Sequence, residues 1–258
     1  MDVIAASFDR KGPSIWGANP WVPGNSGHGL RHQLLSDTER ARLAAISSIV
    51  RFKKGEAVYR AGDRADAIFN IIGGVVKSYC GNGDGRIMAF LFPHDLFGLS
   101  EEGAYVNAAQ ALTAVTAYRL PIAPLRQRFA NDALLEYHVI CKLCEELRQA
   151  ERHAFMLGER RADVRIASFL QMLEQLHAAN GDAAGEIYVP MNRSDIGEYV
   201  GLSLAAVSRT FAGLVRRKVI GIRDRRRIEV IDRAAFERIL AGGGARRSSR
   251  RRQGRQVR

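Results

Sequence analysis

Short apolar runs that alternate with glycine-containing turns occupy residues 50–122. The runs are residues 57–59, 67–72, 75–79 and 87–92. Closely spaced short strands with such turns are typical of an antiparallel sandwich or barrel. Asn82-Gly83, between the last two runs, favours a tight hairpin because both central residues of that turn need positive φ. The pattern predicts a β domain in this half of the chain.

A helical pattern follows Pro121 and Pro124 and predicts one long helix over residues 125–157. Its apolar side repeats in steps of three and four, at Ile140, Leu143, Leu147, Ala150, Ala154 and Leu157. Such a repeat lets a helix pack along another helix. The positions beside it are strongly polar, so we expect it to contact a second copy of the chain, with the chain's own core as the alternative. These six residues, called the seam below, predict a homodimer.

Two shorter helices are expected elsewhere. Ser36, followed three residues later by Glu39, is a capping signal and predicts a helix over residues 36–50. A second helix is expected over residues 162–178, with an apolar face of Val164, Ile166, Phe169, Leu170, Leu173 and Leu176.

Residues 193–212, RSDIGEYVGLSLAAVSRTFA, have the residue types of a helix-turn-helix. Gly197 supplies the small residue that the first helix needs where the second crosses it, and Gly201 tolerates the positive φ of the turn. Ser203 can cap the second helix. The apolar residues that must face the shared core are Ile196, Val200, Leu202 and Val207. A chance helical hairpin is the alternative interpretation.

The outward face of the second helix carries side chains that can contact DNA. Arg209 can donate two parallel hydrogen bonds to guanine, and Ser208 can bond to or pack against a base edge. The expected base contacts are Leu204, Ala205, Ser208 and Arg209. A strand, an arginine-rich turn and another strand follow, and this predicted wing suits phosphate contact. The expected backbone contacts are Arg193, Ser203, Arg225, Arg226 and Arg227.

The net charge of +12 and a pI near 10.2 favour a polyanionic partner. Seven of these charges belong to arginines of the tail at residues 242–258, which leaves +5 for the rest of the chain. A basic tail is often only a solvated, disordered end, so charge alone leaves nucleic-acid binding open. Residues 1–29, rich in Gly, Pro, Asn and Ser, are likewise expected to be a disordered arm.

Cysteine usage and hydropathy predict a cytoplasmic protein. The three cysteines form an odd count, which argues against a disulfide framework and fits a reducing compartment. We find no apolar run long enough for a signal peptide or a membrane span. The chain also lacks the G-x-S-x-G, P-loop and H-E-x-x-H motifs, so we do not expect an enzyme.

Several segments together resemble the CRP/FNR family of transcription regulators, nearest its FNR/FixK-like branch. They are FKKGEAVYRAGD, AIFNIIGGVVKSY, AFLFPHDLFGL, RADVRIASFL and MNRSDIGEYVGLSLAAVSRTF, within about residues 30–240. The resemblance implies an α+β fold with a cyclic-nucleotide-binding-like β-roll (jelly roll) sensor at 30–124. It also implies a dimerisation helix at 125–158 and a winged helix-turn-helix at 159–241.

The resemblance further implies a homodimer that binds a palindromic FNR-like site with a TTGAT core in double-stranded DNA. Ser208 and Arg209 match the family's base-contacting residues, whereas Ala205 stands where a glutamate is usual, which leaves the exact half-site open. Microaerobic, nitrogen-oxide or nitrogen-fixation genes are the implied targets, with RNA polymerase as a partner if the protein is an activator. The alternative is a ligand-sensing β-roll that acts mainly through a protein partner.

Neither sensor chemistry of the family is expected. The [4Fe–4S] members need four thiolates, but no cysteine precedes Cys80, and Tyr118 stands where the β-roll ligand would align. Cyclic-AMP members hold the phosphate with an arginine and a serine, which Asn107-Ala108 replaces here, while Glu101-Glu102 adds negative charge. We therefore expect no cofactor and no metal.

Two cysteines and two histidines of the long helix have open roles. Cys141 and Cys144, one helical turn apart, are either redox thiols or small packing residues, and packing is the favoured interpretation. His138 and His153 are expected to be surface residues of the helix.

Overall fold

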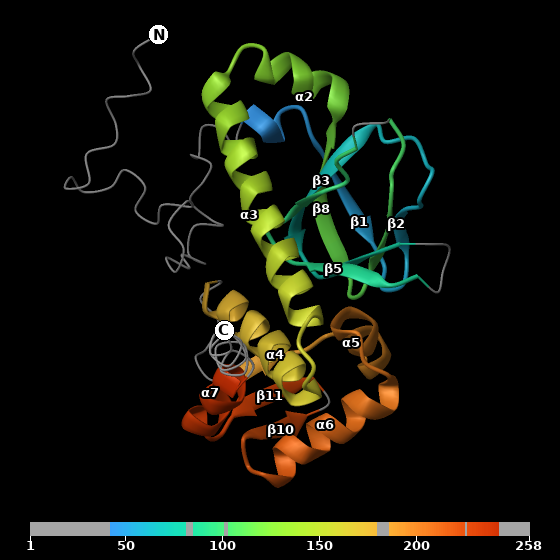
Figure 1. Ribbon diagram of the computed structural model, residues 1–258. Coiled ribbons are helices and arrows are strands. Elements are labelled where there is room, and N and C mark those ends of the chain that lie inside the picture. The colour runs from blue at the N-terminus through green and yellow to red at the C-terminus, as the bar shows by residue number, and fades with distance from the viewer. Residues whose placement is uncertain (1–41, 81–84, 101–102, 180–185, 225, 243–258) are drawn as a thin grey trace, which may run out of the picture.

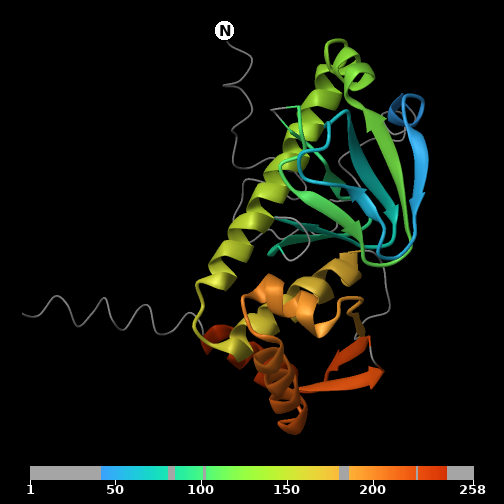
Figure 2. The same cartoon turned by 90° about the vertical axis from the view of Figure 1, so that its right-hand side faces the viewer.

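The computed structural model describes residues 42–80, 85–100, 103–179, 186–224 and 226–242. A β-roll forms one end of the molecule and a smaller domain of helices and strands forms the other (Figure 1). Helix α3 (Ala133–Leu157) runs along one side of the roll and leads to the smaller domain, as Figure 2 shows.

The β-roll consists of two antiparallel four-stranded sheets, ordered β1-β8-β3-β6 and β2-β7-β4-β5. Their strands are β1 Ser48–Phe52, β2 Ala57–Tyr59, β3 Ala67–Gly73, β4 Val76–Tyr79, β5 Ile87–Leu91, β6 Leu96–Phe97, β7 Ala108–Ala111 and β8 Val115–Pro121. All four apolar runs of the sequence form strands here, β2 to β5, which confirms the predicted β domain. Strands β4 and β5 pair as the expected hairpin, whose turn lies outside the described residues.

Aromatic side chains fill the interior of the roll. The rings of Tyr59 and Tyr105 stack with centroids 3.8 Å apart, and those of Phe69 and Phe97 lie 5.4 Å apart. The Tyr105 hydroxyl donates a 2.7 Å hydrogen bond to the carbonyl of Ala67, and the Tyr59 hydroxyl donates a 3.5 Å bond to the side-chain oxygen of Asn107, so both polar groups of this cluster have a partner.

The helix predicted over residues 125–157 is in fact two helices, so that prediction was wrong in one respect. Helix α2 (Ile122–Phe129) begins directly after Pro121 and holds Pro124 in its first turn, where a proline costs no helical hydrogen bond. It ends at Ala130. The side chain of Asp132 then accepts a hydrogen bond from the backbone N–H of Leu135 and starts α3 in a new direction.

The helix predicted over residues 36–50 is also wrong at its C-terminal end. Residues 42–44 are helical, but Ser48 to Val50 belong to strand β1 and pair with β8. The predicted start at Ser36 lies outside the described residues, as do the arm at 1–29 and the tail from residue 243.

The C-terminal domain packs helices around a small sheet. Helix α4 (Ala162–Ala179) confirms the helix predicted over 162–178 and buries Phe169 and Leu170 completely. The other elements are β9 Glu186–Tyr188, α5 Arg193–Val200, α6 Leu204–Arg216, β10 Ile220–Asp224, β11 Arg227–Val230 and α7 Arg233–Gly242. Strands β10 and β11 form the predicted hairpin wing, which β9 extends to three strands.

The roll and the C-terminal domain share one apolar core. Val75 and Phe90 of the roll belong to the same buried cluster as Phe169 and Tyr199 of the C-terminal domain. The β5 strand lies directly over α5 (Figure 1), so the first helix of the helix-turn-helix rests on the roll.

Candidate DNA-binding site

Helix α5 begins at a capping box that the sequence analysis missed. The side chain of Asn192 accepts a 2.8 Å hydrogen bond from the backbone N–H of Asp195, whose carboxylate accepts from the backbone N–H of Asn192 at 3.4 Å. Two backbone donors at the helix start are thereby satisfied. An asparagine followed three residues later by an acidic residue was the available signal.

Two glycines make the corner between α5 and α6, as predicted. Gly201 has φ +66°, a left-handed conformation that glycine adopts without a steric penalty. At Gly197, an added Cβ would lie 2.6 Å from the carbonyl oxygen of Leu202 and 3.5 Å from the Cγ2 atom of Val207. Only glycine, which has no side chain, allows the turn at Leu202 to approach α5 this closely.

The buried face of the corner also follows the prediction. Ile196, Val200 and Val207 are completely buried, and Leu202 is half-buried against the same core. The side chain of Ser203 accepts a 3.2 Å hydrogen bond from the backbone N–H of Ala206 and caps α6. Helix α6 is therefore anchored by one face and by its first turn.

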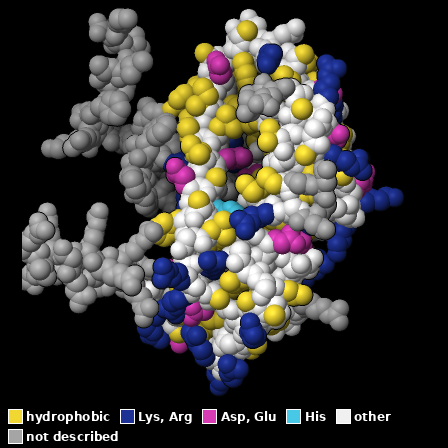
Figure 3. Space-filling model, turned by 45° about the vertical axis from the view of Figure 1, so that its right-hand side comes forward, with side chains coloured by type: hydrophobic (Ala, Val, Ile, Leu, Met, Phe, Trp, Pro, Cys, Tyr) yellow, Lys and Arg dark blue, Asp and Glu magenta, His cyan; other side chains and the backbone are white. Residues whose placement is uncertain are grey.

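The opposite face of α6 is open to solvent. Leu204, Ala205, Ser208 and Arg209 are all exposed. Among the described residues, none forms a hydrogen bond or ion pair with the Arg209 side chain, so its guanidinium is available to a ligand. Lys and Arg side chains gather at this lower end of the molecule, where the C-terminal domain lies (Figure 3).

The expected backbone-contacting arginines have different surroundings. The Arg193 guanidinium stacks 3.4 Å from the centre of the Phe211 ring, and its burial lowers the pKa. Arg227 pairs with Glu186 at 3.0 Å, while the backbone N–H of Arg226 donates to Asp224 and holds the wing turn. Arg225 lies outside the described residues. Phosphate contact by these residues stays a prediction.

Most of the seam on α3 is exposed. Ile140 is 49 % exposed and Leu147 is 61 % exposed, although both are large apolar side chains. Leu143, Ala150 and Ala154 are exposed too, whereas Leu157 is half-buried and lies beside Gly201. Within the described residues, the chain's own core does not cover the first five members.

The two candidate thiols differ in exposure. Cys141 is buried and Cys144 is half-buried, and both are free cysteines. The burial of Cys141 is consistent with the packing interpretation. The redox interpretation of the two thiols stays a prediction.

The prediction that His153 is a surface residue was wrong. Its ring stacks almost parallel on the Tyr199 ring, with centroids 3.9 Å apart, and its Nε2 atom lies 2.7 Å from the backbone oxygen of Tyr199. Burial lowers the pKa of His153, and nearby Arg86 lowers it further. Lys77 of β4 also pairs with Asp195 of α5 at 2.9 Å. These contacts fix α5 against both α3 and the roll.

The roll does not fit the cyclic nucleotide that its fold implies. An added Cβ at Gly98 would lie 3.3–3.4 Å from the rings of Phe69, Tyr105 and Tyr59. Asn107, at the position matched to the phosphate-binding arginine, donates a 2.7 Å hydrogen bond to the Ser78 hydroxyl. Aromatic rings therefore pack closely around Gly98, and the matched position carries no positive charge for a phosphate.

Two negative findings concern metals and membranes. Within the described ranges, no three His, Cys, Asp or Glu side chains are grouped so as to hold a metal ion. None of the described helices is both long and apolar enough to span a bilayer.

A β-roll, a long helix and a winged helix-turn-helix with an open recognition face define a class of DNA-binding transcription regulators. Residues 49–132 match the cyclic nucleotide-binding domain, and residues 164–239 match the Crp-like helix-turn-helix domain. The chain belongs to the CRP/FNR family and is FixK-like.

Individual relatives agree with this assignment. The nitrogen fixation regulation protein FixK of Bradyrhizobium diazoefficiens is 34 % identical over 210 residues, which are 80 % of this chain and 88 % of the relative. The transcriptional activator protein Anr of Pseudomonas protegens is 28 % identical over 74 % of this chain and 81 % of its own length. The solved structure of FixK2 from Bradyrhizobium japonicum has a TM-score of 0.68 and 29 % identity, covering 75 % of this chain and 97 % of that one.

Proposed function

We propose that this regulator binds a palindromic, FNR-like DNA site as a homodimer and reads it with Ser208 and Arg209. The observation that carries the proposal is the orientation of α6, in which Val207 is fully buried while Ser208 and Arg209 point to solvent. A helix anchored on one face and open on the other can enter the major groove.

Base reading by α6 follows from the chemistry of its open face. Arg209 can donate a bidentate pair of hydrogen bonds to guanine, and Ser208 can contact the neighbouring base edge. Ala205 offers no carboxylate to accept a hydrogen bond from cytosine N4, so selectivity at that position is expected to be weaker. A TTGAT core is the proposed half-site. Leu204 and Ala205 are the other two proposed base contacts. The proposed contacts to the DNA phosphates are Arg193, Ser203, Arg225, Arg226 and Arg227.

The homodimer is proposed from the seam. Large apolar side chains on one exposed stripe of α3 are suited to a parallel partner helix, whose own seam would cover them. Two copies related by a twofold axis would place their α6 helices about one DNA turn, roughly 34–36 Å, apart.

The biological setting is proposed from the relatives. FixK is named for the regulation of nitrogen fixation, and Anr is named as a transcriptional activator. We propose that this protein acts in the cytoplasm as a regulator rather than an enzyme. Its targets would be microaerobic, nitrogen-oxide or nitrogen-fixation genes, and RNA polymerase would be its partner in activation.

The test of base reading compares two arginines of α6 on two DNA sequences. Arg209→Ala should lose about 1–3 kcal/mol of binding free energy on a TTGAT palindrome and little on unrelated DNA. Arg216→Ala, in the last turn of the helix, should weaken binding to both sequences alike. Fluorescence anisotropy at several salt concentrations measures both. An equal loss for Arg209→Ala on all DNA would refute base reading, and salt-independent binding would favour action through a protein partner.

The test of the seam uses two leucines of α3 with nearly equal exposure. Leu147 is 61 % exposed within the seam, and Leu134 is 60 % exposed outside it. Leu147→Glu should convert the dimer to a monomer in sedimentation velocity, because two carboxylates would face each other across the helices. Leu134→Glu should leave the dimer intact. A monomeric wild type, or a dimer that survives Leu147→Glu, would contradict the proposal.

A further inference from the structure

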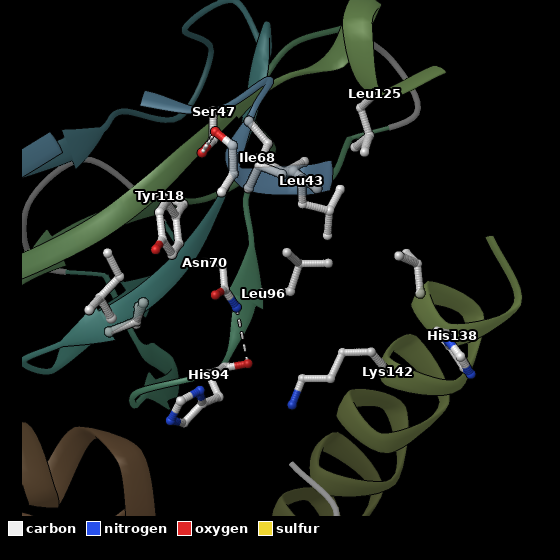
Figure 4. A pocket seen from close by; sticks show the side chains of 15 residues that line it. Leu43, Ser47, Ile68, Asn70, His94, Leu96, Tyr118, Leu125, His138 and Lys142 are labelled. Atoms are coloured by element: carbon white, nitrogen blue, oxygen red, sulfur yellow. Dashed lines mark hydrogen bonds between the residues drawn. The ribbon is translucent and has the colours of Figure 1, made fainter. Parts of the chain in front are cut away.

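A cavity of about 330 Å³ lies between the β1-β8-β3-β6 sheet and α3. Figure 4 shows side chains from both walls pointing into it, with Ile68 and Leu96 on the sheet side and Lys142 on the helix side. The volume is at the lower end of the roughly 300–1,000 Å³ usual for small-molecule pockets.

The cavity is separate from the aromatic interior of the roll. Its apolar border is mainly a small cluster of Ile68, Leu96, Leu120 and Leu125, and Ile71 is the lining residue that it shares with the cluster that contains Tyr59. Ala44 and Ile72, which also line it, are exposed, so the cavity opens at the surface.

The charges at one end of the cavity favour a neutral occupant. The Nζ atom of Lys142 lies 3.2 Å from a carboxylate oxygen of Glu145 and 3.6 Å from one of Asp95. The positive charge of Lys142 is therefore already engaged by two carboxylates, and Asp95 is only 2 % exposed. A carboxylate or phosphate on a ligand would have to compete with them for Lys142 and would also pay a desolvation cost.

Two neutral polar groups line the cavity in addition. The side-chain amide of Asn70 donates hydrogen bonds to the backbone oxygens of His94 and Asp95, both at 3.2 Å. The group of Asn70 that can bind an occupant is therefore its side-chain oxygen, as an acceptor. Tyr118 supplies a hydroxyl. A few polar groups in an apolar wall are typical of sites that orient a small ligand.

The backbone beside the cavity is strained. His94, which lines it, has φ +73°, although it is not a glycine. The turn that holds it is fixed by the Asp95 carboxylate, which accepts a 2.8 Å hydrogen bond from the backbone N–H of Phe92. Strain of this kind concentrates at ligand sites, and here it coincides with an open apolar cavity.

We infer that this cavity binds a neutral, predominantly apolar small molecule that carries a hydroxyl or N–H group. The apolar walls bury the body of the molecule, Asn70 accepts from its hydrogen, and Tyr118 donates to its oxygen where it has one. Because Val139 and Lys142 belong to α3, the occupant touches the helix that carries the seam.

The test titrates the full-length protein with N-phenyl-1-naphthylamine, a neutral aromatic probe with one N–H group that fluoresces in apolar surroundings. Saturable binding of one molecule per chain is expected. Octanol should displace the probe, whereas octanoate, which has the same chain length and a negative charge, should not. Absence of saturable binding, or equal displacement by the two competitors, would overturn the inference.

Two variants place the probe in this cavity rather than on the exposed seam. Val139→Phe fills the cavity from α3 and Ala44→Trp blocks it from the opposite wall, and each should weaken probe binding by about tenfold or more. Leu134→Phe adds similar bulk on α3 outside the cavity and should leave binding unchanged. Ala44 is exposed, so its variant should fold even if Val139→Phe does not. Unchanged binding in folded Ala44→Trp protein would refute the site, and this result is independent of DNA binding.

Discussion

Gly197→Ala should loosen the helix-turn-helix, whereas Gly213→Ala should not. Both glycines lie within helices of the motif, α5 and α6, and both substitutions add the same methyl group. At Gly197 the methyl carbon would lie 2.6 Å from the carbonyl oxygen of Leu202, which is backbone and cannot rotate away. At Gly213 an added Cβ meets nothing within 4 Å.

The expected magnitudes follow from this geometry. Relieving the 2.6 Å contact requires the turn to shift away from α5, and overpacking of this kind costs about 1–3 kcal/mol. At about 2–4 °C per kcal/mol for a chain of this size, the melting temperature should fall by several degrees. Gly213→Ala removes a flexible residue from a helix interior and should stabilise the protein by about 0.4–1 kcal/mol.

Two measurements separate the effect on folding from that on recognition. Urea denaturation followed by circular dichroism reports the free energy of unfolding of both variants. Fluorescence anisotropy with the selected DNA site reports recognition, which Gly197→Ala should weaken because α6 moves relative to α5. Equal stability of Gly197→Ala and wild type, or similar destabilisation by the two variants, would refute the argument that Gly197 is required for close approach.

Two further predictions concern the contacts of α5. Lys77→Met leaves the carboxylate of Asp195 without its ion-pair partner and should cost about 1–3 kcal/mol of unfolding free energy; a double-mutant cycle with Asp195→Ala that gives no coupling energy would contradict this. The lowered pKa of His153 means that the unfolded chain binds a proton on this ring more readily than the folded protein does. Stability should therefore fall as the pH drops through about 6.5, the ordinary pKa of histidine, and His153→Gln should remove this part of the pH dependence in urea titrations at each pH.

The strands and the helix-turn-helix were predictable because local sterics determine them. The roll strands alternate with glycine turns on a short period, and the corner at Gly197 and Gly201 admits very few other residues. The burial of Val207 followed from the same geometry, since a two-helix corner has only one inner face.

The break between α2 and α3 was missed because the apolar pattern continues through it. Leu125, Phe129, Ala133 and Tyr137 recur every four residues, so periodicity alone predicts one helix. The signal lay in Asp132, a residue that can cap a new helix start, directly after Asn131. Capping residues inside an apolar pattern are therefore better evidence of a helix boundary than the pattern itself.

Contacts between the two domains could not be read from the sequence, because each partner has a sufficient local explanation. Lys77 fits a polar position of a strand, and Asp195 fits the capping box of α5, yet the two meet across 118 residues of chain. In the sequence, His153 cannot be distinguished from other polar residues of the helix, and only the structure shows that its ring stacks on Tyr199. Because α5 is held by the roll and by α3 at once, a shift of α3 against the roll would be passed to the helix-turn-helix. An occupant of the cavity beside Val139 and Lys142 would act at the same junction, which gives the roll a physical route to influence DNA binding.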